Sequence, residues 1–278
     1  MASNQRVAVV TGSSSGIGHE TSLTLARNGF LTYASMRSLH KGENIKSLAE
    51  KEKLPLKIVQ LDVTDDISVK NAIQSITAEA NRIDVLVNNA GYAVVGAFED
   101  CSMEEIKAQY ETNLFGVIRV TQAVLPVMRK QKSGIIVNIS SGAGKIAIPV
   151  QSAYVSTKFA IEGLSESMAY ELEPFGIKVV LVEPGFIKTN IGNNLVTAKK
   201  SQDANSPYSQ LTEKMVSFIE HVSRSPPDVV AKAVLKAVTS ENPTMRYLAG
   251  KDAEKWMEAK RGMSDEEFHE MMKQNMMK

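Results

Sequence analysis

The eight residues TGSSSGIG, from Thr11 to Gly18, constrain the fold of this chain more than any other stretch. They contain three glycines and three serines and directly follow the apolar run Val7–Val10. A turn of such small residues between a buried strand and a helix lets the backbone approach a pyrophosphate, whose charge then lies at the positive N-terminus of the helix. A tight turn without a ligand is the alternative, but chance would give this glycine spacing only about 0.06 times in such a chain. The segment therefore predicts a nucleotide site.

Short apolar, β-branched runs alternate along the chain with longer segments of helical apolar spacing. This alternation predicts one α/β domain over residues 1–278, a doubly wound Rossmann-type fold with helices on both faces of a parallel sheet. Runs that are apolar throughout are typical of strands buried on both sides. The predicted strands are residues 7–10, 31–34, 57–61, 85–87, 135–139, 179–182 and 246–248.

Composition excludes several classes of protein. The 278 residues are 43% apolar and 23% charged with a net charge of +1, so the chain can bury a core but has no basic surplus for nucleic acid. The single cysteine, Cys101, cannot form an internal disulfide, and the first residues lack the apolar segment of a secretory signal. No apolar run approaches the roughly 18 residues of a membrane helix. We therefore expect a cytoplasmic protein without a membrane span or a nucleic-acid partner, and we assign no metal ligands.

The end of the second predicted strand indicates which dinucleotide is bound. Sites for NAD place an acidic residue about 20 residues past the glycines, whereas sites for NADP provide an arginine for the 2′-phosphate. Here the strand runs into Arg37 with no acid nearby, and a guanidinium suits a dianionic phosphate. Ser13 and Ser15 could add hydroxyl donors to the same phosphate. A solvated surface arginine is the alternative, and we predict NADP(H).

Chemistry is expected at the carboxyl ends of the strands, where ligands lie in open parallel sheets. Ser141 follows the fifth predicted strand, and Tyr154 and Lys158 lie in a predicted helix soon after it. A spacing of four residues places the tyrosine and the lysine on one helix face, where the ammonium favours the phenolate and the phenol can exchange a proton near neutral pH. Ser141 can hydrogen-bond a carbonyl oxygen beside that phenol.

The order of these motifs along nearly the whole chain resembles the short-chain dehydrogenase/reductase family. The resemblance implies a seven-stranded parallel sheet and hydride transfer between a nicotinamide and a carbonyl or alcohol carbon. It implies that Tyr154 is the general acid/base and that Ser141 polarises the carbonyl. It further implies that Lys158 binds the nicotinamide ribose and lowers the pKa of the phenol, and that Asn113 holds a water that links Lys158 to solvent. The matching stretches are residues 11–18, 61–63 and 88–91, Asn113, Ser141, Tyr154, Lys158 and residues 184–185.

The residues and the resemblance together give the predicted cofactor contacts. For some of them a structural role is the alternative: residues 62–65 could be a strand end with a helix cap, residues 88–91 a turn, and Asn113 a surface or kink residue. The predicted contacts are Gly12, Ser14, Ser15, Gly16, Ile17, Gly18, Arg37, Asp62, Val63, Asn89, Gly91, Tyr154, Lys158, Pro184, Gly185, Ile187 and Thr189.

Substrate choice is less constrained than the cofactor. The predicted pocket walls, residues 92–98, residues 144–150 and the segment after Gly185, are mostly apolar, which favours a hydrophobic ketone or aldehyde, or the matching alcohol. Residues 32–37 and 246–253 resemble the branch that holds 17β-hydroxysteroid and retinol dehydrogenases. Because family branches are reused for unrelated carbonyl compounds, no substrate is named.

Three further segments carry expectations about closure and assembly. Residues 190–225 resemble the substrate lid of the family, although their amphipathic part could equally be a packed surface helix. The methionine-rich tail at 252–278 could contact a partner subunit, cover the pocket or fray. The resemblance implies a homodimer or homotetramer, formed through helices that begin near Ser102 and Ala153. Apolar residues in excess of one core face suggest an interface as well: Phe115, Val117, Ile118, Val120 and Ala123.

These features predict an NADP(H)-dependent carbonyl reductase, or an alcohol dehydrogenase for the reverse reaction. Two alternatives stay open, a 3-oxoacyl thioester reductase and a non-catalytic protein that senses NADP(H). The nearly neutral charge argues against an acidic acyl carrier as partner. The set of Ser141, Tyr154 and Lys158 favours an enzyme, because a sensor has no need of a phenol of lowered pKa beside a hydride donor.

Overall fold

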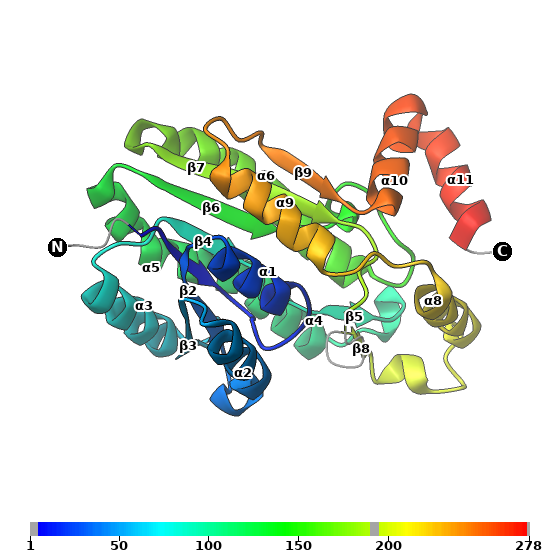
Figure 1. Ribbon diagram of the computed structural model, residues 1–278. Coiled ribbons are helices and arrows are strands. Elements are labelled where there is room, and N and C mark those ends of the chain that lie inside the picture. Colours follow the sequence, from blue (N-terminus) through cyan, green and yellow to red (C-terminus); the bar gives the residue numbers. More distant parts are fainter. Residues whose placement is uncertain (1–4, 190–194, 277–278) are drawn as a thin grey trace.

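A parallel sheet of seven strands forms the centre of the computed structural model, which describes residues 5–189 and 195–276 (Figure 1). The strand order is β3-β2-β1-β4-β6-β7-β9. All seven predicted strands are present, so the predicted α/β class is confirmed. The strands are β1 (Val7–Val10), β2 (Leu31–Met36), β3 (Leu56–Gln60), β4 (Val85–Asn88), β6 (Gly134–Ile139), β7 (Ile177–Pro184) and β9 (Arg246–Ala249).

Helices cover both faces of the sheet. Successive residues of β1 point to opposite layers, because side chains alternate along a strand: Val9 packs with α3 and α5, and Val10 packs with α1 and α9. The apolar strands are therefore buried on both sides, as their composition predicts. One layer contains α1 (Gly16–Arg27), α2 (Glu43–Glu52) and α9 (Asp228–Thr239), and the other contains α3 (Asp66–Ala80), α5 (Gly116–Gln131) and α6 (Ser152–Leu172).

The chain order reverses at β1, which pairs with β2 on one side and with β4 on the other. In open parallel sheets the ligand crevice lies outside the carboxyl ends of the strands at such a reversal. The glycine-rich turn follows β1 and residues 89–91 follow β4, and the Thr11 N–H donates to Val87 O at 3.0 Å. The topology thus brings two of the predicted cofactor segments side by side.

A third group of elements packs around α8, α10 and α11 (Figure 1). Its apolar cluster includes Met215 of α8, Met257 of α10 and Met272 of α11, so the methionine-rich tail is packed rather than frayed as far as residue 276. Residues 190–194 of the predicted lid, and residues 277–278 of the tail, lie outside the described residues. The elements of this region are β5 (Ala93–Val95), which pairs with β8 (Leu195–Thr197), and the helices α8 (Ser209–His221), α10 (Lys251–Gly262) and α11 (Asp265–Met276).

The remaining elements are short connections between these layers. In the described part of the chain, no helix combines the length and the apolarity that crossing a membrane requires. The connections are α4 (Met103–Tyr110), the π-helical turn η3 (Glu111–Phe115) and the 3₁₀ turns η1 (Leu39–Gly42), η2 (Phe98–Asp100), η4 (Gly142–Gly144), η5 (Glu173–Phe175) and η6 (Lys200–Gln202).

Candidate active site

The glycine-rich turn folds tightly against the loop that follows β4. Gly12 has a φ of +70°, a left-handed conformation that favours glycine, and a Cβ there would lie 2.9 Å from Ala90 Cα. A Cβ on Gly18 would lie 2.4 Å from both Gly12 O and Asn89 Nδ2, so α1 reaches the turn only with glycine at that position. The shape of the turn is therefore imposed by the protein's own backbone as well as by space for a ligand.

Ser13 differs from the other two serines of the turn, because Ser14 and Ser15 line a cleft and Ser13 does not. The Ser13 hydroxyl is fully buried, donates to Val10 O at 2.9 Å and accepts a hydrogen bond from Ser22 Oγ at 2.9 Å. The prediction that Ser13 provides a phosphate donor is wrong, because this hydroxyl is used within the turn. Gly12, Ser14, Ser15 and Ile17 line a cleft of about 310 Å³, which we call the central cleft, whereas Gly16 and Gly18 do not line it.

Asn89 ties the central cleft together from the other side. Its side-chain amide donates to Thr11 O at 2.8 Å and to Gly12 O at 3.2 Å. The backbone N–H groups of Asn89 and Ala90 donate to Thr11 Oγ1 at 2.9 and 3.0 Å. Asn89 and Gly91 both line the central cleft, so the structural interpretation of residues 88–91 and their predicted cofactor role are compatible.

A second cleft, of about 650 Å³, lies at the end of β2 and is called the β2 cleft here. Arg37 and Lys41 line it, together with Asp62 and Val63 at the end of β3. The Arg37 side chain is exposed and forms no ion pair within residues 5–189 and 195–276. Residues 37–42, RSLHKG, contain two permanent cations and no acid, so this end of the clefts fits a phosphate monoester.

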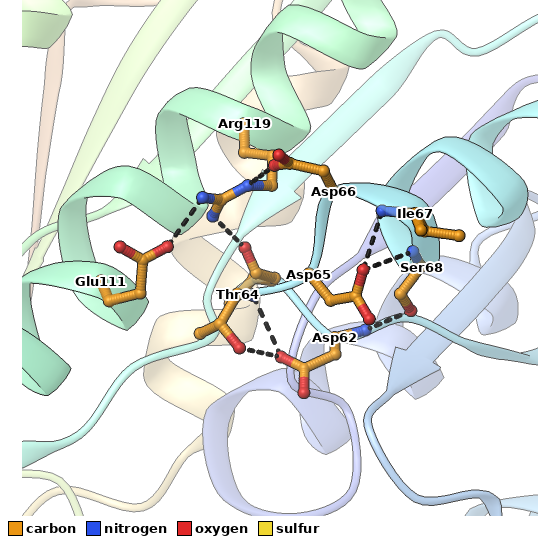
Figure 2. Close-up of polar contacts among 9 residues, drawn as sticks. Asp62, Thr64, Asp65, Asp66, Ile67, Ser68, Glu111 and Arg119 are labelled. Atoms are coloured by element: carbon orange, nitrogen blue, oxygen red, sulfur yellow. Dashed lines mark hydrogen bonds and ion pairs between the residues drawn. The ribbon is translucent and has the colours of Figure 1, made fainter.

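The turn from Asp62 to Ser68 is a dense hydrogen-bonded unit (Figure 2). Asp62 Oδ1 accepts from the backbone N–H and the hydroxyl of Thr64 at 3.0 and 2.8 Å. Asp65, rather than Asp62, caps α3, because its carboxylate accepts from the N–H groups of Ile67 and Ser68. The alternative of a strand end with a helix cap is therefore correct for this turn. The same hydrogen bonds hold Asp62 and Val63 in the wall of the β2 cleft.

Arg119 of α5 fastens the same turn to the helix layer that α3 and α5 share (Figure 2). Its guanidinium donates to Val63 O at 2.6 Å and forms ion pairs with Asp66 and with Glu111, the latter at 2.7 Å. Val63 lines the β2 cleft, so Arg119 holds that wall without reaching the cleft itself. No sequence pattern indicated this residue, because its partners lie 8 to 56 residues away along the chain.

Tyr154 and Lys158 lie one turn apart on α6, as their spacing predicts. Lys158 Nζ lies 5.6 Å from the centroid of the Tyr154 ring and donates to Ile139 O, at the end of β6, at 2.8 Å. Ser141, just beyond the same strand, begins η4 by accepting a hydrogen bond from Ala143 N at 3.1 Å. The carboxyl end of β6 therefore positions both the lysine and the serine beside the phenol.

The protonation of this group is governed by burial. Burial raises the pKa of the Tyr154 phenol, and its hydrogen bond with Ser141 partly opposes the shift. Burial also lowers the pKa of Lys158 to about 8, against the charge of Glu162. The direction at Tyr154 is set by the loss of solvation, which opposes the lowering of the phenol pKa that we expected from the Lys158 ammonium.

Asn113 lies in the π-helical turn η3, which interrupts the helical path from α4 to α5. Its amide pairs with both backbone groups of Tyr92, accepting from N at 3.0 Å and donating to O at 2.8 Å. The same amide donates to Thr157 Oγ1, next to Lys158, at 3.3 Å. Asn113 is thus a buried kink residue that connects the β4 loop to α6, and it does not line the clefts.

An apolar cavity of about 170 Å³ adjoins the central cleft. The cavity and the central cleft have seven lining residues in common, so Tyr154 borders both spaces. These residues are Ala93, Ser141, Tyr154, Pro184, Gly185, Ile187 and Thr189. Sequence analysis named none of five further lining residues individually, although the predicted lid contains one of them and the tail that could cover the pocket contains three. They are Gln151, Arg224, Asp252, Trp256 and Met276.

Comparison with known proteins agrees with this geometry. The short chain dehydrogenase family model matches residues 6–200. The uncharacterized oxidoreductase YusZ of Bacillus subtilis is 40% identical over 254 residues, which are 89% of this chain and 90% of that protein. A 3-ketodihydrosphingosine reductase of Bacteroides thetaiotaomicron is 38% identical over 247 residues, 88% of each chain. Retinol dehydrogenase 8 of Homo sapiens is 35% identical over 261 residues, 88% of this chain and 82% of that one.

Solved structures are similar over nearly the whole fold. A short-chain dehydrogenase from Streptomyces avermitilis has a TM-score of 0.81 and 32% identity, covering 94% of this chain and 99% of that one. An alcohol dehydrogenase from Thermococcus sibiricus, complexed with 5-hydroxy-NADP, has a TM-score of 0.73 and 26% identity, covering 88% of this chain and 96% of that one. The chain belongs to the short-chain dehydrogenase family of oxidoreductases.

Proposed function

We propose that this protein is an NADP(H)-dependent oxidoreductase that reduces a hydrophobic ketone or aldehyde, or oxidises the matching alcohol, with Tyr154 as acid/base. The observation that carries the proposal is that Ser141 and Tyr154 line both the apolar cavity and the central cleft. A substrate carbonyl in the cavity would therefore meet both hydroxyls at the wall it shares with the cofactor. The nicotinamide cofactor supplies or accepts the hydride when it is bound.

Each residue of the group has a distinct task in the proposed reduction. Ser141 Oγ donates a hydrogen bond to the carbonyl oxygen, and Tyr154 Oη transfers its proton to that oxygen as the bond order falls. Lys158, anchored on Ile139 O, favours the phenolate that the transfer leaves behind. Asn113 holds a water molecule that relays protons between Lys158 and solvent. It contacts α6 at Thr157, the residue before Lys158.

NADP(H) is favoured over NAD(H) by the charges at the end of β2. Arg37 and Lys41 line the β2 cleft, and no acidic side chain follows β2 within residues 37–42. Within residues 37–42 a ribose 2′-hydroxyl would find no carboxylate, whereas a 2′-phosphate would find two cations, although Asp62 and Glu111 also line the β2 cleft. The complex of the Thermococcus sibiricus enzyme with 5-hydroxy-NADP supports the same choice.

A hydrophobic substrate is favoured by the walls of the apolar cavity. Ile146, Phe186 and Trp256 are among its mostly apolar lining residues, and its few polar lining residues include Ser141, Tyr154, Arg224 and Asp252. Two relatives are named for lipophilic compounds, 3-ketodihydrosphingosine and retinol. We extend only that chemical character, a carbonyl or alcohol carbon on an apolar body, to this protein.

Assembly as a homodimer or homotetramer is part of the proposal. Val117 and Val120, two of the residues expected at an interface, belong to the core, but Phe115 is 47% exposed, and so is Phe159 of α6. Tyr170, also on α6, is 80% exposed. These exposed aromatic side chains support an interface along α5 and α6. The segment at 190–225 is proposed as a lid and the location as cytoplasmic.

The test is the loss of NADPH absorbance with a panel of lipophilic aldehydes, ketones and one 3-oxoacyl thioester. Tyr154→Phe should lower kcat by about 100- to 10,000-fold, because it removes the proton donor, while NADPH affinity changes little. Tyr170→Phe, on the exposed face of the same helix, is the matched control and should retain full activity. Undiminished turnover by Tyr154→Phe would refute the assignment, and tight NADPH binding without turnover would favour a sensor.

A further inference from the structure

Behind the phenol and the lysine, α6 carries a third polar residue on the same face. Tyr154, Lys158 and Glu162 are spaced four residues apart, so they follow one another along one side of the helix. The Glu162 side chain is only 5% exposed. The proposed reaction gives this buried carboxylate no task, although it is the charged group that acts on Lys158.

A second buried carboxylate lies beside Glu162. Glu183 is on β7, directly before the Pro184-Gly185 wall of the central cleft, and its side chain is 3% exposed. Arg246 of β9 bridges the two acids, because its Nε donates to Glu162 Oε2 at 3.1 Å and lies 3.1 Å from Glu183 Oε1. Two acids from α6 and β7 are thus held together under one guanidinium.

The charges around this pair balance only while Lys158 is an ammonium. Lys145 Nζ lies 3.2 Å from Glu162 Oε2, and both Lys145 and Arg246 also pair with Glu166, which is half exposed. Glu162, Glu166 and Glu183 carry three negative charges, and Arg246, Lys145 and the Lys158 ammonium, on which Glu162 acts, carry three positive ones. Burial and the repulsion between two neighbouring carboxylates disfavour ionisation of the second acid, so one of the pair keeps a proton to a higher pH than an exposed acid would.

The hydrogen bonds point to the place of that proton. Oε1 of Glu162 and Oε1 of Glu183 are buried and accept no hydrogen bond from the part of the chain that the structure describes. A proton between the two acids would give one of these oxygens a donor. Burial and the neighbouring Glu162 raise the pKa of Glu183 to about 7, which agrees with a shared proton near neutral pH.

We infer that Glu162 and Glu183 are positioning residues that share one proton, and that release of this proton to solvent supplies the negative charge that keeps Lys158 an ammonium as the pH rises. The inference rests on the proposed function, in which Lys158 is the cation beside Tyr154. With the proton bound, the pair carries one negative charge, and without it two. The second negative charge of the acid pair favours the ammonium form of Lys158 in the pH range where burial alone would make this lysine neutral.

The experiment follows the titrations directly by NMR, in the cofactor-free protein labelled with ¹³C at glutamate Cδ and lysine Cε. One glutamate carboxyl should titrate near pH 7 in the wild type, and Glu183→Gln should remove that titration. Glu162→Gln and Glu183→Gln should each lower the titration midpoint of Lys158 by about one pH unit, because each removes a nearby negative charge. Lys158→Arg assigns the lysine signal.

Glu166→Gln is the matched control, since it removes a carboxylate that pairs with the same two cations but is half exposed. It should leave both titrations in place. The inference is overturned if no glutamate carboxyl titrates above about pH 6, or if the midpoint of Lys158 is the same in both buried-pair variants and the wild type.

Turnover separates this inference from the proposed function. In an active enzyme, Glu183→Gln should move the alkaline limb of the kcat profile down by the same pH interval as the Lys158 midpoint, with a smaller effect on KM. If the titrations are as expected but Tyr154→Phe leaves turnover unchanged, the acid pair is supported and only the proposed function is refuted. Turnover that depends on Tyr154, with a kcat profile unmoved by both variants, would refute the acid pair.

Discussion

Replacing Glu183 by glutamine should make the stability of this protein less dependent on pH. The pKa of Glu183 is about 7 in the folded chain against a usual 4.5, so the folded state keeps a proton that the unfolded chain releases. Stability from this group is fully present below the unfolded pKa and is lost as the pH rises through the folded pKa. Between pH 5 and pH 8 the loss amounts to about 2 kcal/mol.

The assay is urea unfolding at several pH values, followed by circular dichroism, for the wild type and Glu183→Gln. Glutamine has the size of the protonated glutamate side chain and a hydrogen-bond donor, but it cannot ionise. The free energy of unfolding of Glu183→Gln should therefore fall by about 2 kcal/mol less than that of the wild type over this pH range. Glu166→Gln should follow the wild type, because its carboxylate is half exposed. Parallel curves for wild type and Glu183→Gln would refute the reasoning, since they would mean that no proton is retained on folding.

Three further substitutions test the cofactor and substrate assignments. Arg37→Ala should weaken NADPH by about 10- to 100-fold, the loss of one charged hydrogen-bond partner, with NADH affinity nearly unchanged; equal losses for both would disprove the phosphate role. Asp252 accepts from Phe186 N at 2.6 Å, so Asp252→Ala should reduce kcat/KM by about tenfold and Asp252→Asn by less, which steady-state kinetics can check. Met276→Ala enlarges the apolar cavity and should shift kcat/KM toward bulkier ketones by about tenfold; an unchanged order of substrates would place the substrate elsewhere.

The sheet could be predicted closely because its signal is local. The inner strands β1, β4 and β6 are mostly apolar runs buried from both sides, while the edge strands β3 and β9 are only partly buried; each strand of the sheet begins and ends within two residues of its prediction. The turn after β1 was equally readable, since glycine at positions 12 and 18 answers a steric demand that few other residues satisfy. Helical periodicity placed Tyr154 and Lys158 on one face, but only Ser141 at the end of the preceding strand distinguished this pair from Tyr247 and Lys251, which have the same spacing.

What the sequence could not supply depends on side-chain direction and on long-range pairing. Three successive serines are equivalent in sequence, and only the folded turn directs Ser13 inward to Val10 O. The pair of Glu162 and Glu183 forms because β9 brings Arg246 against both, 84 and 63 residues away in the chain, and no local pattern records that meeting. The sign of the shift at Tyr154 was likewise decided by the degree of burial, which spacing does not reveal.

The walls of the apolar cavity have a consequence for biosynthesis. The glycine-rich turn, Arg37 and Lys41 of the β2 cleft and the Tyr154 helix are all encoded before residue 173, and residues 184–189 complete the central cleft, whereas Trp256 and Met276 join the apolar cavity from α10 and α11. On a ribosome, the residues of the central cleft emerge while the edge strand β9 and this wall of the cavity are still unmade. The nascent protein can therefore assemble the glycine-rich turn and the central cleft first, and the apolar cavity is completed only when residues 246–276 have left the exit tunnel.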